Sequence, residues 1–213
     1  MEKQRIEVNH VFKSFKEKEV LKDVSLTCES GKIYGIVGHN GSGKTVLFKC
    51  ICGFFIQFIS DCIQKFQIMK PAPLAQKTRF FYNNSGILQH VGIFPHTFPI
   101  YSDFSSVTVK KSADTFEKVG LEPRSKIPVG KYSLGMRQRL AIGQAIMENP
   151  DILILDEPMN GLDKNGVQEM RGLFEQMKNE GKLIILASHN REDIDVLCDE
   201  VYEMENGILK KRR

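Results

Sequence analysis

This sequence lacks long apolar runs and has no strong excess of either charge. No run of about 18 apolar residues occurs in it, so we expect no membrane-spanning helix. The formal net charge of +4 is small, and acidic residues are mixed with the basic ones, which argues against nucleic-acid binding. The polar start MEKQRIEVNH is unlike a secretory signal. We expect the basic block at residues 210–213 to be solvated, with contact to a membrane surface or a partner as the alternative.

Cysteine is also scarce. The five cysteines form no C-x-x-C pair, and we interpret them as reduced, buried thiols. A metal site built from Cys50, Cys52 and Cys62 would lack a fourth ligand and the usual ligand spacing. The cysteines are Cys28, Cys50, Cys52, Cys62 and Cys198.

The sequence does have the composition of an ordinary globular protein. It is 41% hydrophobic and 26% charged, and its 213 residues suit a single domain. Short apolar runs alternate with helical patterns, which predicts a mostly parallel sheet with helices on its faces. Strands are predicted at 5–11, 24–29, 31–38, 151–158, 182–188 and 200–205, and helices at 44–52, 134–147, 164–179 and 190–197. Residues 50–60 are interpreted as a buried helix end that leads into a strand, and residues 57–110 are otherwise left unassigned.

The segment GHNGSGKT at residues 38–45 fits the phosphate-loop pattern G-x-x-x-x-G-K-[ST]. A predicted buried strand precedes it and a predicted helix follows it, which is the context that the pattern requires; a glycine-rich turn without a ligand is the alternative. Lys44 is predicted to contact the β- and γ-phosphates of a nucleotide, and Thr45 to be a ligand of Mg²⁺. The predicted nucleotide-binding residues of this loop are Gly38, His39, Asn40, Gly41, Ser42, Gly43, Lys44 and Thr45.

A pair of carboxylates follows the apolar run ILIL in the segment ILILDEP, residues 152–158. Ligands of such sheets bind at the carboxyl ends of the strands. We expect Asp156 to hold Mg²⁺, directly or through water, and Glu157 to act on an attacking water as general base or positioning group. The alternative is that the two acidic residues only cap the start of a helix. Burying two adjacent carboxylates there is costly, however, unless a cation or a hydrogen-bond donor pairs with them.

A second helix start follows the segment YSLG in YSLGMRQR, residues 132–139. The hydroxyl of Ser133 and the first N–H groups of the helix are groups that bind phosphate. The chain already has one phosphate loop, so this second helix start must face another phosphate or serve another purpose.

These motifs, in this order, resemble the ATP-binding subunit of an ATP-binding cassette (ABC) transporter over nearly the whole chain. The segment YSLGMRQRLAIGQAI is similar to the signature segment of that family, usually written L-S-G-G-Q, and the helix after it. Ser133 and Gly135 match the signature, whereas Tyr132, Leu134 and Met136 depart from it. Leu134 replaces a glycine of the signature and Met136 replaces an amide side chain. Both changes affect how strongly the segment would bind phosphate. Such a variant resembles bacterial drug- and peptide-resistance exporters.

The resemblance implies an α/β fold of the P-loop NTPase, ABC type. Its parts would be a mostly parallel sheet core, an N-terminal antiparallel β part and a helical subdomain. Residues 1–213 would form one domain, with the helical subdomain inserted at approximately 90–148. The Pro-Thr-Ser-Gly turn and β-hairpin that usually follow the first helix in the family do not show in residues 53–74.

The resemblance also implies further site residues. Gln89 would be the glutamine that touches Mg²⁺ or the attacking water, or else an exposed loop residue. Asp163 in MNGLD would shape the site of a facing subunit and cap the next helix. His189 would contact the γ-phosphate, the alternative being a structural histidine. Phe15 would stack on adenine, with Phe12 as the competitor and one of the two in the core.

The implied mechanism needs two copies, either a homodimer or a heterodimer with a related subunit. ATP and Mg²⁺ would bind between them, and Ser133 and Gly135 of one chain would face the phosphate held by the other. Hydrolysis would power a separate integral membrane permease, and the signature variant favours an exporter. The chain would then lie in the cytoplasm, on the inner face of the cell membrane. The alternatives are a nucleotide-binding scaffold or regulator with lost or weak hydrolysis, and a soluble ABC ATPase not tied to transport.

Overall fold

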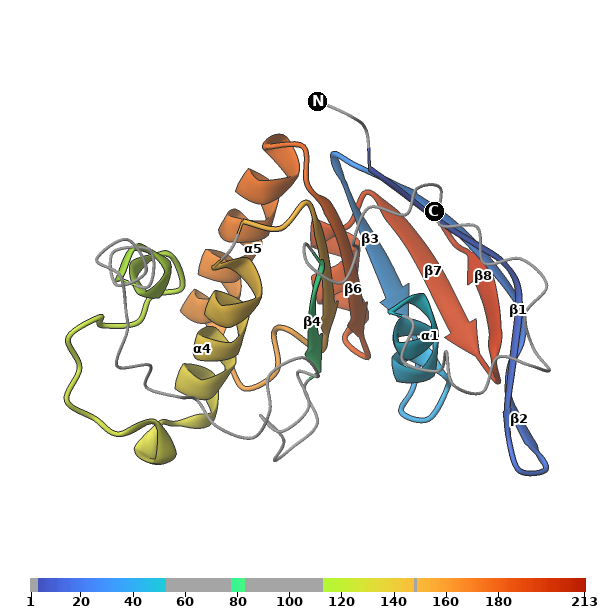
Figure 1. Ribbon diagram of the computed structural model, residues 1–213, viewed down its shortest axis with the longest axis horizontal. Coiled ribbons are helices and arrows are strands. Elements are labelled where there is room, and N and C mark those ends of the chain that lie inside the picture. The colour runs from blue at the N-terminus through green and yellow to red at the C-terminus, as the bar shows by residue number, and fades with distance from the viewer. Residues whose placement is uncertain (1–3, 53–77, 83–112, 148) are drawn as a thin grey trace.

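The computed structural model describes residues 4–52, 78–82, 113–147 and 149–213 (Figure 1). Residues 113–118 are also helical. The elements are β1 (Arg5–Phe15), β2 (Lys18–Glu29), β3 (Lys32–Val37), α1 (Lys44–Ile51), β4 (Thr78–Tyr82), the short 3₁₀ helix η2 (Val129–Lys131), α4 (Leu134–Ile146), β5 (Ile152–Asp156), α5 (Lys164–Asn179), β6 (Leu183–Ser188), α6 (Arg191–Leu197), β7 (Glu200–Glu205) and β8 (Ile208–Lys211).

The main sheet has the strand order β4-β5-β6-β3-β7-β8. The pairs β4–β5, β5–β6, β6–β3 and β3–β7 are parallel, and only β8 joins in antiparallel. A separate antiparallel pair is formed by β1 and β2. The predicted α/β fold with a mostly parallel sheet and an N-terminal antiparallel β part is therefore confirmed. Strands β4 and β8 were not predicted.

Two hydrophobic cores lie on the two faces of the main sheet, because neighbouring residues of a strand point to opposite faces. In β5, Leu153 and Leu155 pack with α4, α5 and α6, whereas Ile152 and Ile154 pack on the face that α1 and the β1–β2 pair cover. Figure 1 shows these three layers, with α4 and α5 on one side of the sheet and β1–β2 on the other. Burial on both faces explains why the central strands read as unbroken apolar runs.

Strand β1 is irregular, and this irregularity overturns one prediction. Ile6 and Val8 are buried, but the pairing with β2 shifts between Val8 and Val11, where His10 has a φ of 51°. The extra residue of this bulge turns Val11 inward and Phe12 outward. Phe12 and Phe15 are 48% and 44% exposed, so the expectation that one of them belongs to the core is wrong.

The basic segment at 210–213 is exposed but ordered. Its first two residues belong to β8, and the backbone of Arg212 and Arg213 hydrogen-bonds to Val201. The guanidinium of Arg213 donates to the carbonyl oxygens of Asp195 and Cys198 at the end of α6, where cations are favourable.

Two of the cysteines depart from the prediction. Cys28 and Cys198 are buried free thiols, whereas Cys50 and Cys52 are only half-buried. Cys62, most of the segments 50–60 and 57–110, and much of the predicted helical subdomain lie outside the described residues. Among the residues that are described, no helix is long and apolar enough to cross a membrane.

Candidate nucleotide-binding site

The parallel register of the sheet brings three of the predicted motifs to one edge. Val37 at the end of β3 pairs with Ser188 at the end of β6, and Asp156 at the end of β5 pairs with Ala187. The loop 38–43, the carboxylate pair and His189 each follow directly from one of these strand ends. Sequence segments that lie about 150 residues apart therefore meet at the carboxyl edge of the sheet, as expected for this type of sheet.

The loop before α1 leaves backbone N–H groups available to an anion. Gly41 and Gly43 have φ angles of 82° and 115°, which a residue with a side chain rarely adopts. Gly43 is the N-cap of α1, and no side chain of the described residues caps that helix, so the N–H groups of its first turn can bind phosphate. The hydroxyl of Ser42 is buried and finds no hydrogen-bond partner within the described part of the chain, which fits a ligand atom at this position.

Lys44 is buried and turned back onto its own loop. Its Nζ donates to the carbonyl oxygens of Gly38 at 2.6 Å and His39 at 3.3 Å, and it lies 4.0 Å from Oε1 of Glu157. A cation held by two neutral carbonyls gains more from phosphate oxygens, because those carry charge. The side chain is thus positioned to exchange these carbonyls for the phosphates of a nucleotide.

The hydroxyl of Thr45 donates to Oδ2 of Asp156 at 2.6 Å, which joins the phosphate loop to β5. Burial raises the pKa of Asp156 to about 6, against the hydrogen bond from Thr45, and the charge of Glu157 raises it further. A buried carboxylate beside a hydroxyl offers the hard oxygen ligands that Mg²⁺ prefers, and a divalent cation would offset the cost of burying the charge. The donor set therefore fits the predicted magnesium site.

Glu157 is held by its backbone and by its side chain. It has a φ of 53°, which is unusual for a residue with a side chain, and its N–H donates to the carbonyl oxygen of Ala187 at 2.8 Å. Its Oε2 accepts a hydrogen bond from Ser188 Oγ at 3.2 Å and lies 2.9 Å from Nδ1 of His189. The site thus combines a fixed carboxylate with an imidazole that is 52% exposed at the side chain and open to a substrate.

The second helix start, at α4, is not part of this constellation. Ser133 Oγ accepts a hydrogen bond from Met136 N at 3.1 Å and so caps the helix, which leaves the hydroxyl proton of Ser133 to donate elsewhere. Helices α4 and α1 pack on opposite faces of the sheet. Within the described residues, no hydrogen bond joins Ser133 or Gly135 to the phosphate loop. The two helix starts that are predicted to bind phosphate therefore do not converge within one chain.

The loop between the carboxylates and α5 lies against the start of α4. A Cβ added to Gly135 would lie 2.9 Å from the carbonyl oxygen of Gly161, and one added to Gly161 would lie 2.5 Å from Cγ of Leu134. Leu134, one of the three departures from the family signature, thus lies against Gly161. Asp163 ends this loop and accepts a hydrogen bond from Gly166 N at 2.8 Å, so its predicted helix-capping role is observed.

The other predicted residues have different outcomes. Gln89 lies outside the described residues. Phe15 lies in β1 with Nζ of Lys13 5.4 Å from its ring centroid, and its exposed ring stays a predicted adenine contact. Met136, in the first turn of α4, packs against the hydrophobic core and offers no amide.

The sequence predictions did not include two residues that contact Glu157. Ser188 donates to its carboxylate, and Gln138 donates to its carbonyl oxygen. The signal for Ser188 was its place at the end of a buried strand. The signal for Gln138 was its spacing of four residues from Leu134 and Ile142, which puts a polar side chain on an otherwise apolar helix face.

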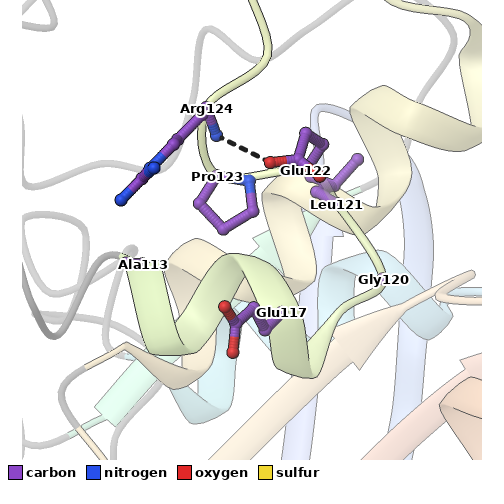
Figure 2. Close-up of a pocket in the computed structure, with 7 residues that line it drawn as sticks. All are labelled: Ala113, Glu117, Gly120, Leu121, Glu122, Pro123 and Arg124. Carbon is purple, nitrogen blue, oxygen red and sulfur yellow. Dashed lines mark hydrogen bonds between the residues drawn. The ribbon is translucent and has the colours of Figure 1, made fainter.

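An open pocket of about 690 Å³ lies elsewhere, at the helical residues 113–118 and the turn that follows them. Figure 2 shows its lining, in which the backbone N–H of Arg124 donates to the carboxylate of Glu122. Among the predicted site residues that the structure describes, none lines it.

Comparison with known proteins agrees with the motifs. The sequence pattern of the family described as ABC transporter matches residues 21–160. The ABC transporter ATP-binding protein YybJ of Bacillus subtilis (strain 168) is 39% identical over 207 residues, which are 96% of this chain and 94% of the relative. The bacitracin transport ATP-binding protein BcrA of Bacillus licheniformis is 32% identical, covering 96% of this chain and 68% of the relative. The lantibiotic transport ATP-binding protein SrtF of Streptococcus pyogenes is 29% identical, covering 97% and 90%.

Solved structures show the same fold. A nucleotide-free ATP-binding cassette from an ABC transporter superposes with a TM-score of 0.77 at 22% identity, over 100% of this chain and 92% of that one. A dimeric bacterial ABC transporter cassette superposes with a TM-score of 0.76 at 20% identity, over 98% and 99%. The chain belongs to the ABC transporter family, as an ATP-binding subunit of the kind that hydrolyses ATP to power transport.

Proposed function

We propose that the chain hydrolyses ATP at the carboxyl edge of its sheet, with the magnesium ion held by Thr45, Asp156 and Gln89. The observation that carries this proposal is the convergence of an uncapped helix start, a buried lysine and two carboxylates at that edge. Bound Mg²⁺ supplies charge neutralisation of the phosphates. The chain supplies the remaining positive charge through Lys44 and the N–H groups of the loop.

In this proposal Glu157 orients and deprotonates the attacking water. Its carboxylate is held by Ser188 and His189, so little rotational freedom is lost when the water binds. His189 is the more exposed partner, and its free ring nitrogen is available for the γ-phosphate. Loss of the γ-phosphate removes that contact and the contacts of Lys44. The loss of these contacts can change the conformation of the chain after hydrolysis.

We propose that two chains complete each other's sites. Ser133, through its hydroxyl proton, and Gly135, through the backbone of α4, would contact a phosphate held by the partner chain, and Asp163 would lie at the same interface. Two observations support this. The helix start of α4 is exposed and separate from the phosphate loop of its own chain, and a solved structure of the same fold is dimeric. The dimer would be a homodimer or a heterodimer with a related subunit.

The transport role needs a separate integral membrane permease, and we propose that the chain binds it at the cytoplasmic face of the cell membrane. Relatives named for bacitracin and lantibiotic transport favour an exporter whose substrate is a peptide. Helical residues 113–118 and their neighbours in the proposed subdomain at about 90–148 would belong to the partner-facing part.

The test of the hydrolytic site compares Glu157→Gln with Glu180→Gln. Glu180 is an exposed glutamate at the C-terminal end of α5. Phosphate release and nucleotide binding are measured on the purified full chain. We expect Glu157→Gln to lose at least about 100-fold in turnover and to keep ATP binding, because only the charge that acts on water is removed. Turnover that survives in Glu157→Gln would refute the assignment. Binding without turnover in the unaltered chain would indicate a scaffold.

A further inference from the structure

We infer that Gln138 is a positioning residue for Glu157: its buried amide holds the two backbone carbonyls that follow β5 and thereby sets the direction of the catalytic carboxylate. This inference rests on the proposed role of Glu157. It assigns a function to a residue of α4, the helix whose first turn carries the signature segment.

The contacts of Gln138 are specific. Its side chain is 3% exposed, and Nε2 donates to the carbonyl oxygen of Glu157 at 3.2 Å and to that of Pro158 at 2.9 Å. Both partners are acceptors, so only the NH₂ end of the amide can face them. Burying an amide is costly unless it is hydrogen-bonded, and these two bonds offset that cost.

The segment that Gln138 holds has a backbone conformation that needs support. Glu157 has a φ of 53°, and its carbonyl oxygen also accepts a hydrogen bond from Asn160 N at 3.2 Å in the turn that follows. Residues in this region of conformational space persist only when their surroundings hold them. The N–H of Glu157 is fixed on Ala187 and the carboxylate on His189. Gln138 supplies the support on the remaining side, from α4.

Two neighbouring contacts make α4 a rigid support. Leu134, one turn before Gln138 on the same helix face, lies against Gly161 further along the loop. Arg139 donates to the carbonyl oxygen of Val119 at 2.8 Å and to Glu169 of α5 at 2.5 Å. Helix α4 is therefore fixed to Val119, to α5 and to the loop at Gly161. Because α4 is fixed, the amide of Gln138 holds the carbonyls of Glu157 and Pro158 in a fixed position.

The experiment compares Gln138→Met, which keeps the size and removes the donor, with Gln144→Met, the same change at a half-buried position in the same helix. Turnover and KM for ATP are measured on the purified full chain. We expect Gln138→Met to lower kcat between about 5- and 50-fold with KM within about twofold, because a displaced Glu157 affects the chemical step rather than ATP binding. We expect Gln144→Met to stay within about twofold of the unaltered chain in both.

A second measurement separates positioning from folding. In the Glu157→Gln background, where hydrolysis is already removed, Gln138→Met should leave ATP affinity within about twofold of the parent. Gln138→Asn, whose amide is one methylene too short, should repeat the kcat effect. The inference is overturned if both variants keep kcat, if KM rises as much as kcat falls, or if both lose ATP binding in the Glu157→Gln background. Turnover that survives in Glu157→Gln itself would instead refute the proposed function.

Discussion

Oε2 of Glu157 lies 2.9 Å from Nδ1 of His189, so the two residues that follow β5 and β6 form one hydrogen-bonded pair. The imidazole can donate to the carboxylate through Nδ1 and present Nε2 to a phosphate. Ser188, the last residue of β6, adds a second hydrogen bond to the same carboxylate oxygen. This relationship supports the proposal that His189 acts in hydrolysis as well as in the structure.

The pair predicts that His189→Ala lowers turnover at least about tenfold, because Glu157 loses an orienting partner and the γ-phosphate loses a contact. Single-turnover hydrolysis with excess protein gives the rate of the chemical step. His10→Asn is the control, because that exposed imidazole lies in β1, pairs with Asp23 outside the phosphate loop, and has a φ of 51° that asparagine tolerates. An equal loss in both variants would contradict a special role for His189.

The raised pKa of Asp156 predicts a gain in stability when its charge is removed. The folded protein raises this pKa from 3.8 to about 6, so the charged form is penalised at neutral pH by at most about 3 kcal/mol. The penalty is full above pH 6 and disappears as the pH falls toward 4. Asp156→Asn should therefore unfold at higher denaturant than the unaltered chain at pH 8, without nucleotide or Mg²⁺, and the gap should close by pH 4.

The control for that measurement is Asp114→Asn, an exposed aspartate in the helical residues 113–118. We expect it to change stability by less than about 0.5 kcal/mol at either pH. Asp156→Asn should at the same time weaken the stabilisation that Mg²⁺ and ATP give together, because the proposed ligand of the ion would lose its charge. A variant that is less stable at pH 8 than at pH 4, relative to the unaltered chain, would contradict the assigned burial penalty.

The contact between Leu134 and Gly161 predicts that Gly161→Ala destabilises the fold by about 1–3 kcal/mol. The new Cβ would lie 2.5 Å from Cγ of Leu134, and the φ of 76° disfavours any side chain. Leu134→Ala should recover the part that comes from the clash, which chemical denaturation of the double variant would measure as a coupling of at least about 0.5 kcal/mol. Gly172→Ala in α5 is the control, because its Cβ would meet no atom within 4 Å. Purely additive effects would rule the contact out.

The buried thiols predict a selective pattern of chemical modification. Burial raises the pKa of Cys198 to about 12, and burial also raises the pKa of Cys28. Because the thiolate is the reactive form, both should resist alkylation in the folded chain at pH 8. Mass spectrometry after iodoacetamide treatment checks this, with the denatured chain as the control in which every cysteine reacts. Rapid labelling of Cys198 in the folded chain would contradict the packing of α6 on β3.

The sequence predicted the central sheet well because its strands are buried on both faces, which leaves a clear apolar signature. It also placed Asp156 and Glu157 correctly at a strand end, since parallel strands bring such ends together. The orientation of Phe12 could not be predicted, because it depends on a bulge at His10 that only the pairing with β2 reveals. Strand β8 was missed because its basic residues look like a solvated segment.

The contacts of Gln138 were missed for a related reason. The pattern of apolar residues along a helix shows that a residue faces the core, but it does not show which carbonyl groups accept its hydrogen bonds. The same limit applies to Leu134, which looks like a loss when set against the family signature and proves to cover Gly161. Helix periodicity therefore predicts which side chains are buried, whereas the partners of buried polar groups depend on the path of a distant loop.

The most direct test of the central claim, that two chains share each site, is the mass of the Glu157→Gln chain in solution with and without ATP and Mg²⁺. Light scattering should give a monomer without nucleotide and a dimer with it, because in the proposed dimer unhydrolysed ATP would bridge the phosphate loop of one chain and α4 of the other. Glu157→Gln combined with Ser133→Arg should bind ATP and remain a monomer. A dimer that persists with Ser133→Arg, or a Glu157→Gln chain that binds ATP and never dimerises, would contradict the account.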